Sequence, residues 1–311
     1  MNVVFFGTPD FAVPSLERLS RSPKLRLPLV VSQPDKPAGR RQTLSAPPIA
    51  RLARDRALAL SQPKTIRGNA EFLDELRRLA ADLFVVVAYG RIFPTELLEL
   101  PRFGCVNLHA SLLPRHRGAS PIQSAILSGD SVTGVTTMRM TEGLDEGPIY
   151  LRREMPILES DTAGSLSERL AIEGAALLAE TIGAIAEGKM TFSPQRGEPT
   201  FCRPIRRRDG EILWAKPAEE IWRAWRAYTP WPGVFTSLGG ERVKLDRLRL
   251  GRGFPGPPGT ARAAAEGLEI ASGGGTSVLA GEIQREGRKR LTADEFLRGL
   301  PAAGALRFGS P

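Results

Sequence analysis

The sequence predicts an α/β protein in which a Rossmann-like, mostly parallel sheet is followed by a small β-barrel. In roughly the first two thirds, short apolar runs alternate with helical stretches, as in doubly wound sheets. In the last third, short strands are separated by Gly-Gly, Pro-Gly and Gly-Gly-Gly turns. A chain of 311 residues also exceeds the usual size of one domain. We place a first domain at residues 1–188, a linker at 189–208 and a second domain at 209–311.

Apolar runs and helical spacing place the elements of the first domain. The stretch 69–79 is predicted to be helical because Phe72 and Leu76 fall on one face. Gly7 stands alone after the first strand, so the GxGxxG motif of dinucleotide-binding proteins is missing. The segment 33–48 interrupts the alternation with four prolines, and loops this long are usually functional or disordered. We expect strands at 3–6, 27–33, 81–88, 105–108 and 149–157. We expect helices at 11–19, 69–79 and 165–187, and a further helix that begins at about 120.

The second domain is predicted to begin with a helix at 218–228. Its Trp222 and Trp225 lie on one side with Ile221 and Tyr228, a stripe more typical of a core than of a platform for bases. A helix from Thr292, with Glu295 three residues later as a capping box, ends the pattern. The barrel strands are expected at 234–237, 242–250, 268–271 and 277–283.

Both histidines of the chain, His109 and His116, lie in the stretch 105–123. Side chains two apart in a strand share a face, so Asn107 and His109 should project together where the strand ends. A loop and a helix follow, and open α/β sheets place their chemistry at such strand ends. Downstream, Asp145 lies between glycines in a loop that could present its carboxylate to the imidazole.

Each of these residues also has a structural interpretation. Alone, Asn107 would be a turn or edge-strand amide, His109 a hydrogen-bonded core histidine and Asp145 a turn residue. Together they form a polar group at the end of an apolar strand, and a buried polar group needs partners. The combination favours a functional pocket.

Composition limits the class of protein. The chain is 41% hydrophobic and 25% charged, as expected for a soluble globular protein. Two cysteines, Cys105 and Cys202, provide neither a disulfide framework nor a metal pair, and no metal is expected. No signal peptide or run of about 20 apolar residues is found, so we expect a cytoplasmic protein without a membrane segment.

The net charge is +9, and it is unevenly distributed. Residues 206–311 hold 18 Lys and Arg against 12 Asp and Glu, so a net +6 lies in the last third. Phosphate neutralisation supplies most of the sequence-independent affinity for nucleic acids, and a polyanionic partner fits this asymmetry. A merely basic surface is the alternative.

Several motifs resemble those of one family. Asn107-x-His109, the following SLLPRxRG and the downstream LDxG are similar to the signature of the 10-formyltetrahydrofolate-dependent formyltransferases. Four further stretches resemble the methionyl-tRNA branch of that family, and the resemblance covers nearly the whole chain. They are FFGTPDFAVP at 5–14, QPDKPAGR at 33–40, VAYG at 87–90 and YTPWPG at 228–233.

The resemblance implies a formyltransferase fold with an OB-like, tRNA-binding barrel. It implies that Asn107 and His109 stabilise an oxyanion, that Asp145 orients His109 and assists proton transfer, and that 10-formyltetrahydrofolate donates the formyl group. Initiator methionyl-tRNA would be the acceptor and the enzyme a monomer. The implied folate-binding residues are Tyr89, Gly90, Arg91, Ile92, Ser111, Leu112, Leu113 and Pro114, and the tRNA-binding candidates are Arg40, Arg41, Arg206 and Arg207.

Two other functions are compatible with parts of the pattern. Formyltransferases acting on glycinamide ribonucleotide or an amino-sugar nucleotide share the Asn-x-His and Asp elements, but they need neither the 33–48 loop nor a basic barrel. A non-catalytic RNA-binding protein would leave the grouping of Asn107, His109 and Asp145 unexplained.

Overall fold

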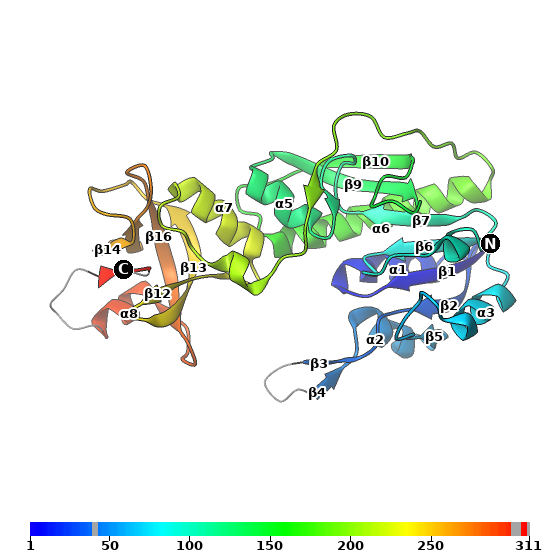
Figure 1. Cartoon of the computed structure of the whole chain (residues 1–311), viewed down its shortest axis with the longest axis horizontal. Helices are drawn as coiled ribbons and strands as arrows, with labels where there is room; N and C mark the ends of the chain where they lie inside the picture. Colours follow the sequence, from blue (N-terminus) through cyan, green and yellow to red (C-terminus); the bar gives the residue numbers. More distant parts are fainter. Residues whose placement is uncertain (39–42, 300–305, 310–311) are drawn as a thin grey trace. The chain divides into compact units, whose positions relative to one another are not determined.

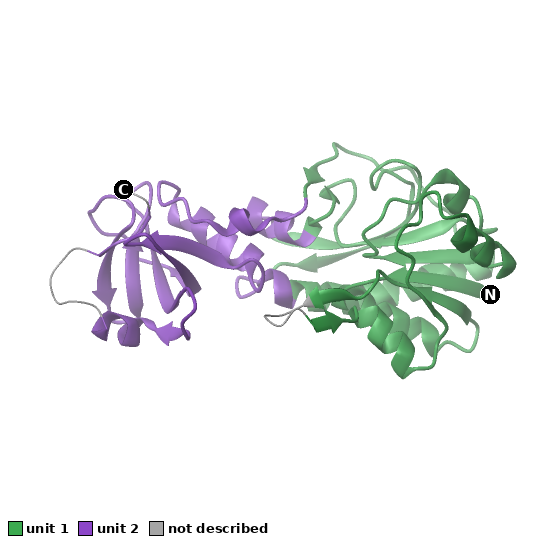
Figure 2. Cartoon of the chain, turned by 60° about the horizontal axis from the view of Figure 1, so that its bottom comes forward, with its two compact units in different colours: residues 1–121, 131–157, 166–203 green, residues 122–130, 158–165, 204–311 purple. Residues whose placement is uncertain are grey.

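The computed structural model describes residues 1–38, 43–299 and 306–309, and the chain divides into two compact units (Figures 1 and 2). Unit 1 contains residues 1–121, 131–157 and 166–203. Unit 2 contains residues 122–130, 158–165 and 204–311. No helix within the described residues is long and apolar enough to cross a membrane.

A seven-stranded sheet forms the centre of unit 1, in the order β10-β9-β7-β6-β1-β2-β5 (Figure 1). The five strands from β7 to β5 are parallel, and β9 and β10 complete one edge in antiparallel orientation. The predicted mostly parallel sheet is confirmed. The strands are β1 (Asn2–Gly7), β2 (Arg26–Val31), β5 (Leu60–Ser61), β6 (Leu83–Val87), β7 (Cys105–His109), β9 (Val132–Arg139) and β10 (Ile149–Pro156).

Strand β9 was not expected from the sequence. Its segment VTGVTTMR lacks a run of apolar residues because threonines occupy buried positions. The Thr137 hydroxyl is hydrogen-bonded to the Thr181 hydroxyl over 2.8 Å. Buried hydroxyl groups with partners of this kind make a strand interior that hydrophobic periodicity does not detect.

Helices cover both faces of the sheet. On one face, Phe6 of β1 packs in a cluster with Phe72 and Leu76 of α3. On the other, α6 approaches β7 so closely that a Cβ at Gly174 would lie 2.8 Å from the Leu108 side chain. The helices of unit 1 are α1 (Val13–Ser20), α2 (Pro48–Asp55), α3 (Ala70–Arg78), α4 (Thr95–Leu98) and most of α6 (Ala163–Ala186), with a 3-10 turn η1 (Asp10–Ala12) before α1, whereas α5 (Pro121–Ser128) belongs almost wholly to unit 2.

The long segment 33–48 contains a short hairpin. Strand β3 (Lys36–Ala38) pairs antiparallel with β4 (Thr43–Ser45), and α2 begins directly afterwards at Pro48. The tRNA-binding candidates Arg40 and Arg41 lie outside the described residues.

Unit 2 is built on an antiparallel sheet in the order β12-β13-β16-β15-β14-β18, with β17 paired to β16. An isolated antiparallel bridge between Leu238 and Phe308 joins its first and last strands, so the sheet curls back on itself. The small barrel is therefore confirmed. Its elements are η2 (Arg207–Gly210), α7 (Ala218–Tyr228), β12 (Val234–Leu238), β13 (Glu241–Leu250), β14 (Thr260–Ala264), β15 (Gly267–Ala271), β16 (Ser277–Arg285), β17 (Leu291–Thr292), α8 (Ala293–Arg298) and β18 (Leu306–Arg307).

The helices of unit 2 begin where the sequence predicts. Helix α7 covers residues 218–228, and α8 starts with the expected capping box between Thr292 and Glu295. Of the apolar stripe on α7, Ile221 and Tyr228 are buried, whereas its two tryptophans are half-buried.

Candidate active site

The candidate site lies at the carboxyl end of β7. In the ladder, Asn107 stands opposite Val86 of β6, and His109 stands opposite Thr136 of β9. The two residues are separated by one position, so they project to the same face of the sheet. His109 is buried and Asn107 is half-buried. The Asn107 side-chain amide has no hydrogen-bond partner among the described residues, and its N–H groups are available to a ligand.

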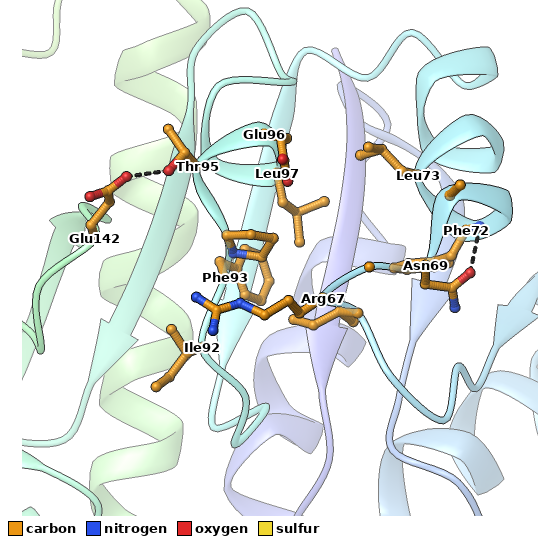
Figure 3. A pocket seen from close by; sticks show the side chains of 14 residues that line it. Arg67, Asn69, Phe72, Leu73, Ile92, Phe93, Thr95, Glu96, Leu97 and Glu142 are labelled. Carbon is orange, nitrogen blue, oxygen red and sulfur yellow. Dashed lines mark hydrogen bonds between the residues drawn. The ribbon is translucent and has the colours of Figure 1, made fainter.

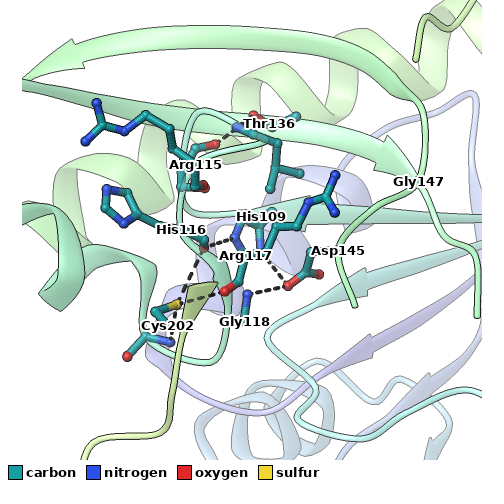
Figure 4. Close-up of polar contacts among 12 residues, drawn as sticks. His109, Arg115, His116, Arg117, Gly118, Thr136, Asp145, Gly147 and Cys202 are labelled. Atoms are coloured by element: carbon teal, nitrogen blue, oxygen red, sulfur yellow. Dashed lines mark hydrogen bonds and ion pairs between the residues drawn. The ribbon is translucent and has the colours of Figure 1, made fainter. Parts of the chain in front are cut away.

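His109 has an acceptor at each ring nitrogen (Figure 4). Its Nε2 lies 3.0 Å from the carbonyl oxygen of His116, so this nitrogen must donate a hydrogen. Its Nδ1 lies 3.6 Å from Oδ2 of Asp145, a distance that suits an ion pair but is long for a hydrogen bond. Both acceptors would be satisfied by N–H groups on the two ring nitrogens.

A backbone group of a neighbouring strand holds the carboxylate of Asp145. The backbone N–H of Gly118 in β8 (Arg117–Gly118) donates to its Oδ2 over 2.8 Å. Asp145 itself has a left-handed backbone with φ of 49°, which an L-residue rarely adopts. Neighbouring contacts must therefore hold this part of the loop in place.

Gln195 supplies those contacts, and no sequence pattern indicated it. Its amide nitrogen donates to the carbonyl oxygens of Asp145 and Gly147, each over 2.8 Å. Its amide oxygen accepts from Nε and Nη2 of Arg117, at 3.1 and 2.7 Å. One glutamine thus ties the Asp145 loop to β8. It lies among prolines and glycines in the segment that we predicted to be a linker, where no periodicity marks a structural role.

The same segment braces His109. Strand β11 (Phe201–Cys202) pairs in parallel with β8, and the Cys202 thiol lies 3.5 Å from the carbonyl oxygen of His116. That carbonyl is the acceptor for the His109 ring. A Cβ at Gly118 would lie 2.2 Å from the Cys202 carbonyl oxygen, so only glycine allows the two strands this approach.

The predicted folate loop lies after β6. The Tyr89 ring is buried against Phe6 and Phe93, and burial raises the pKa of its phenol to about 12. Gln33 donates to the Tyr89 carbonyl oxygen over 2.8 Å. From Gly90 to Phe93, no backbone N–H or C=O group is hydrogen-bonded within the part of the chain that the structure describes. Ile92 is 77% exposed. The loop therefore offers backbone groups and an apolar side chain to a ligand.

The second predicted folate segment is tightly held. Thr136 donates to the Ser111 carbonyl oxygen over 2.7 Å, and Arg152 donates to the Leu113 carbonyl oxygen over 3.1 Å. The side chains of Ser111, Leu113 and Pro114 are buried, and Leu112 is half-buried. These hydrogen bonds hold the segment firmly, and it follows His109 closely in the chain.

The tRNA-binding candidates that the structure describes belong to unit 2. Arg206 and Arg207 are exposed, and the Arg206 backbone N–H donates to Asp209 over 2.7 Å at the start of η2. They are thus at the beginning of the barrel unit.

A hollow of about 610 Å³ in unit 1 adjoins the predicted folate loop (Figure 3). Of the predicted site residues, only Ile92 lines it. Its lining includes Arg67 but also Glu96 and Glu142, so it offers no clear preference for a charged ligand. Within the described residues, no group of three His, Cys, Asp or Glu side chains could hold a metal ion.

Known proteins are similar to this chain over its whole length. The formyl transferase family model covers residues 1–182, and the model of the formyl transferase C-terminal domain covers residues 204–301. Methionyl-tRNA formyltransferase of Acidobacterium capsulatum is 44% identical over 100% of both chains. That of Myxococcus xanthus is 46% identical over 96% of this chain and 94% of its own length.

A solved structure shares the fold at low sequence identity. The N-formyltransferase of Helicobacter canadensis, in complex with folinic acid and dTDP-3-aminofucose, has a TM-score of 0.66 and 21% identity. The match covers 91% of this chain and 98% of that one.

Proposed function

This chain belongs to the formyltransferase family, and we propose that it transfers a formyl group from 10-formyltetrahydrofolate to the amino group of methionine on initiator methionyl-tRNA, for translation initiation. The observation that carries this proposal is the similarity to methionyl-tRNA formyltransferases over the whole length, which includes the barrel unit. The grouping of His109 and Asp145 beside an unpartnered amide supports it independently.

Formyl transfer needs donors for an oxyanion and a route for a proton. When the amine attacks the formyl carbon, the carbonyl oxygen becomes negative, and preorganised N–H donors stabilise it. We assign this role to the amide of Asn107 and the Nδ1–H of His109. Because Nε2 is held firmly at 3.0 Å and Nδ1 faces Asp145 at 3.6 Å, the Nδ1–H is the ring donor that can also serve an oxyanion.

Asp145 completes the chemistry in this proposal. Its carboxylate orients the imidazolium and accepts the proton that the attacking amine loses. The carbon–nitrogen bond to the folate then breaks, and the proton goes to the departing nitrogen. No net oxidation occurs, and no further reactant is required.

The folate is proposed to bind between two segments. Backbone groups from Gly90 to Ile92 would read the edge of its flat ring, because they have no partners within the described chain, and Tyr89 would line the ring beside them. The rigid segment from Ser111 to Pro114 would form the neighbouring wall. The candidates for tRNA binding are Arg40, Arg41, Arg206 and Arg207.

The proposal includes a monomeric enzyme that works in the cytoplasm, where aminoacylated tRNA is used. Light scattering after size-exclusion chromatography tests the first point, and a mass near 33.8 kDa is the expected result.

A radiolabelled formyl-transfer assay tests the acceptor. Initiator methionyl-tRNA, glycinamide ribonucleotide and an amino-sugar nucleotide would be offered side by side to the full chain. Label on methionyl-tRNA alone is expected. Label on either small nucleotide instead would replace our acceptor, and RNA binding without any transfer would favour a non-catalytic RNA-binding protein.

A further inference from the structure

Unit 2 contains a basic hollow, and of the residues discussed above only the tRNA-binding candidate Arg207 lines it. Its volume is about 260 Å³, below the 300 Å³ or so at which drug-sized pockets begin. Its lining comes from η2, the loop before β12, and strands β13 and β16 with the turn that follows. The lining includes Arg207, Trp231, Arg242, Lys244, Arg285 and Glu286.

Three cations of the basic hollow lack the acidic partners that other cations of the barrel have. Arg249, on the same strand as Lys244, pairs with Glu266 at 3.2 Å. In contrast, Arg207, Arg242 and Lys244 have no carboxylate within 4.0 Å among the described residues.

The remaining charges of the lining do not cancel these cations. Among the described residues, the carboxylate paired with Arg285 is that of Glu241, as far away as 3.8 Å, and the single acid of the lining is Glu286. The hollow therefore presents an excess of positive charge that the protein itself does not neutralise. Such an excess attracts phosphate groups.

Aromatic rings fix the geometry of the basic hollow. The guanidinium carbon of Arg242 lies 3.6 Å from the centre of the Phe235 ring, so this cation is stacked. Its Nε is buried and has no hydrogen-bond partner within the described residues. The Trp231 side chain is 54% exposed, which is unusual for so large an apolar group. A stacked arginine and an exposed tryptophan thus line one small space.

We propose that the basic hollow binds one unpaired nucleotide of the RNA substrate. The base stacks on Trp231, and Arg242 and Lys244 bind the flanking phosphates. Single-stranded segments of RNA are recognised in this manner because their bases are free to stack on aromatic side chains. The identity of the RNA in this assignment rests on the proposed function. The assignment adds the surface of the barrel unit that holds the RNA.

The experiment compares full-length variants by their affinity for methionyl-tRNA across a range of salt concentrations. Lys244→Gln removes an unpaired cation, and Arg249→Gln removes a paired cation from the same strand, so the second variant is the matched control. Lys244→Gln should lower the slope of log affinity against log salt by about 0.7 to 0.9, the value of one phosphate contact. Arg249→Gln should leave the slope unchanged. Equal slopes in the two variants would overturn the assignment.

Trp231→Ala tests the stacking contact. Affinity should fall about tenfold or more, as is found when a stacking aromatic is removed, whereas Trp231→Phe should retain most of it. Thermal unfolding shows whether Trp231→Ala is folded. If it is not, the comparison of Lys244 with Arg249 still decides the question. Wild-type affinity in a folded Trp231→Ala variant would contradict the proposal.

Formyl-transfer kinetics separate this inference from the proposed function. If both hold, Lys244→Gln raises KM for methionyl-tRNA and leaves kcat unchanged. If the wild-type chain formylates methionyl-tRNA and the variants keep its KM, the basic hollow is not the RNA surface but the function stands. If the wild-type chain binds RNA through the hollow and transfers no formyl group, the proposed function fails and the surface stands.

Discussion

The amide nitrogen of Gln195 lies 2.8 Å from the backbone carbonyl oxygen of Asp145, although 50 positions separate the two residues in the chain. The same nitrogen also serves Gly147, and the amide oxygen accepts two hydrogen bonds from Arg117. Gln195 is therefore a positioning residue for Asp145. It holds a loop whose backbone conformation is unfavourable on its own.

Gln195→Glu should slow the reaction without unfolding the protein. The variant keeps the acceptor for Arg117 but places an oxygen against two carbonyl oxygens, so the Asp145 loop is released. Because small displacements of catalytic groups can cost about a hundredfold, we expect kcat to fall about tenfold to a hundredfold. KM for the formyl donor should change little.

Steady-state kinetics and thermal unfolding together check this prediction. A purely structural role would lower the unfolding temperature and leave the kcat of the folded fraction intact. An unchanged kcat in Gln195→Glu would show that Asp145 does not depend on this contact.

Asn107→Ala and His109→Ala should each lose turnover. Removing one oxyanion donor typically costs about a hundredfold to a thousandfold in rate. Folding and folate binding should persist, because the Asn107 amide has no partner within the described chain and each variant leaves the backbone of β7 intact. Single-turnover formyl transfer, with folate binding measured by calorimetry, is the test. Near-wild-type rates in either variant would remove that residue from the mechanism.

Tyr89→Phe should stabilise the protein near neutral pH. The buried Tyr89 hydroxyl has no hydrogen-bond partner within the described residues, and an unsatisfied buried hydroxyl costs about 1–3 kcal/mol. Its removal should raise the free energy of unfolding by up to about that amount. A loss of stability would instead indicate that the hydroxyl has a partner.

The same variant should change stability at high pH. The Tyr89 phenol has a pKa of about 12 in the folded protein, against 10.0 as the ordinary value. Between these values the folded state binds more protons than the unfolded state, so stability falls as pH rises from 10 to 12. Denaturant unfolding across this range should show a shallower decline for Tyr89→Phe than for the wild-type chain.

Glu269→Gln should weaken the barrel unit and reduce its sensitivity to acid. Burial raises the pKa of Glu269, but hydrogen bonds from Ser277 at 2.6 Å and Arg262 at 2.7 Å outweigh burial and hold the pKa below 4.5. The variant loses a charged, hydrogen-bonded acceptor, and we expect a cost of about 1–3 kcal/mol at pH 7.

The sign of the acid dependence follows from the lowered pKa. Below pH 4.5 the unfolded state takes up a proton before the folded state does, so the contribution of Glu269 is lost as the pH falls through its folded pKa. Unfolding of the barrel unit, followed by tryptophan fluorescence between pH 6 and 3, should be less steep in Glu269→Gln. An equal pH dependence in both proteins would contradict this assignment.

Local sequence patterns determined most of the elements. The spacing of apolar residues indicated α3 and α6, and the pair of Thr292 and Glu295 indicated the start of α8. The motif around Asn107 and His109 was enough to predict the family, which the comparisons confirm. These features could be read because periodicity, capping and motifs are encoded by residues that are close together in the chain.

Contacts over long distances in the chain could not be read in this way. The sequence did not indicate the buried threonine strand β9, the pairing of β8 with β11, or the bonds from Gln195 to the Asp145 loop. It also did not reveal which arginines of the barrel lack an acidic partner. A hydrogen bond or an ion pair depends on which side chains the fold brings within a few ångströms, and a glutamine or an arginine has the same local pattern whether or not such a partner exists.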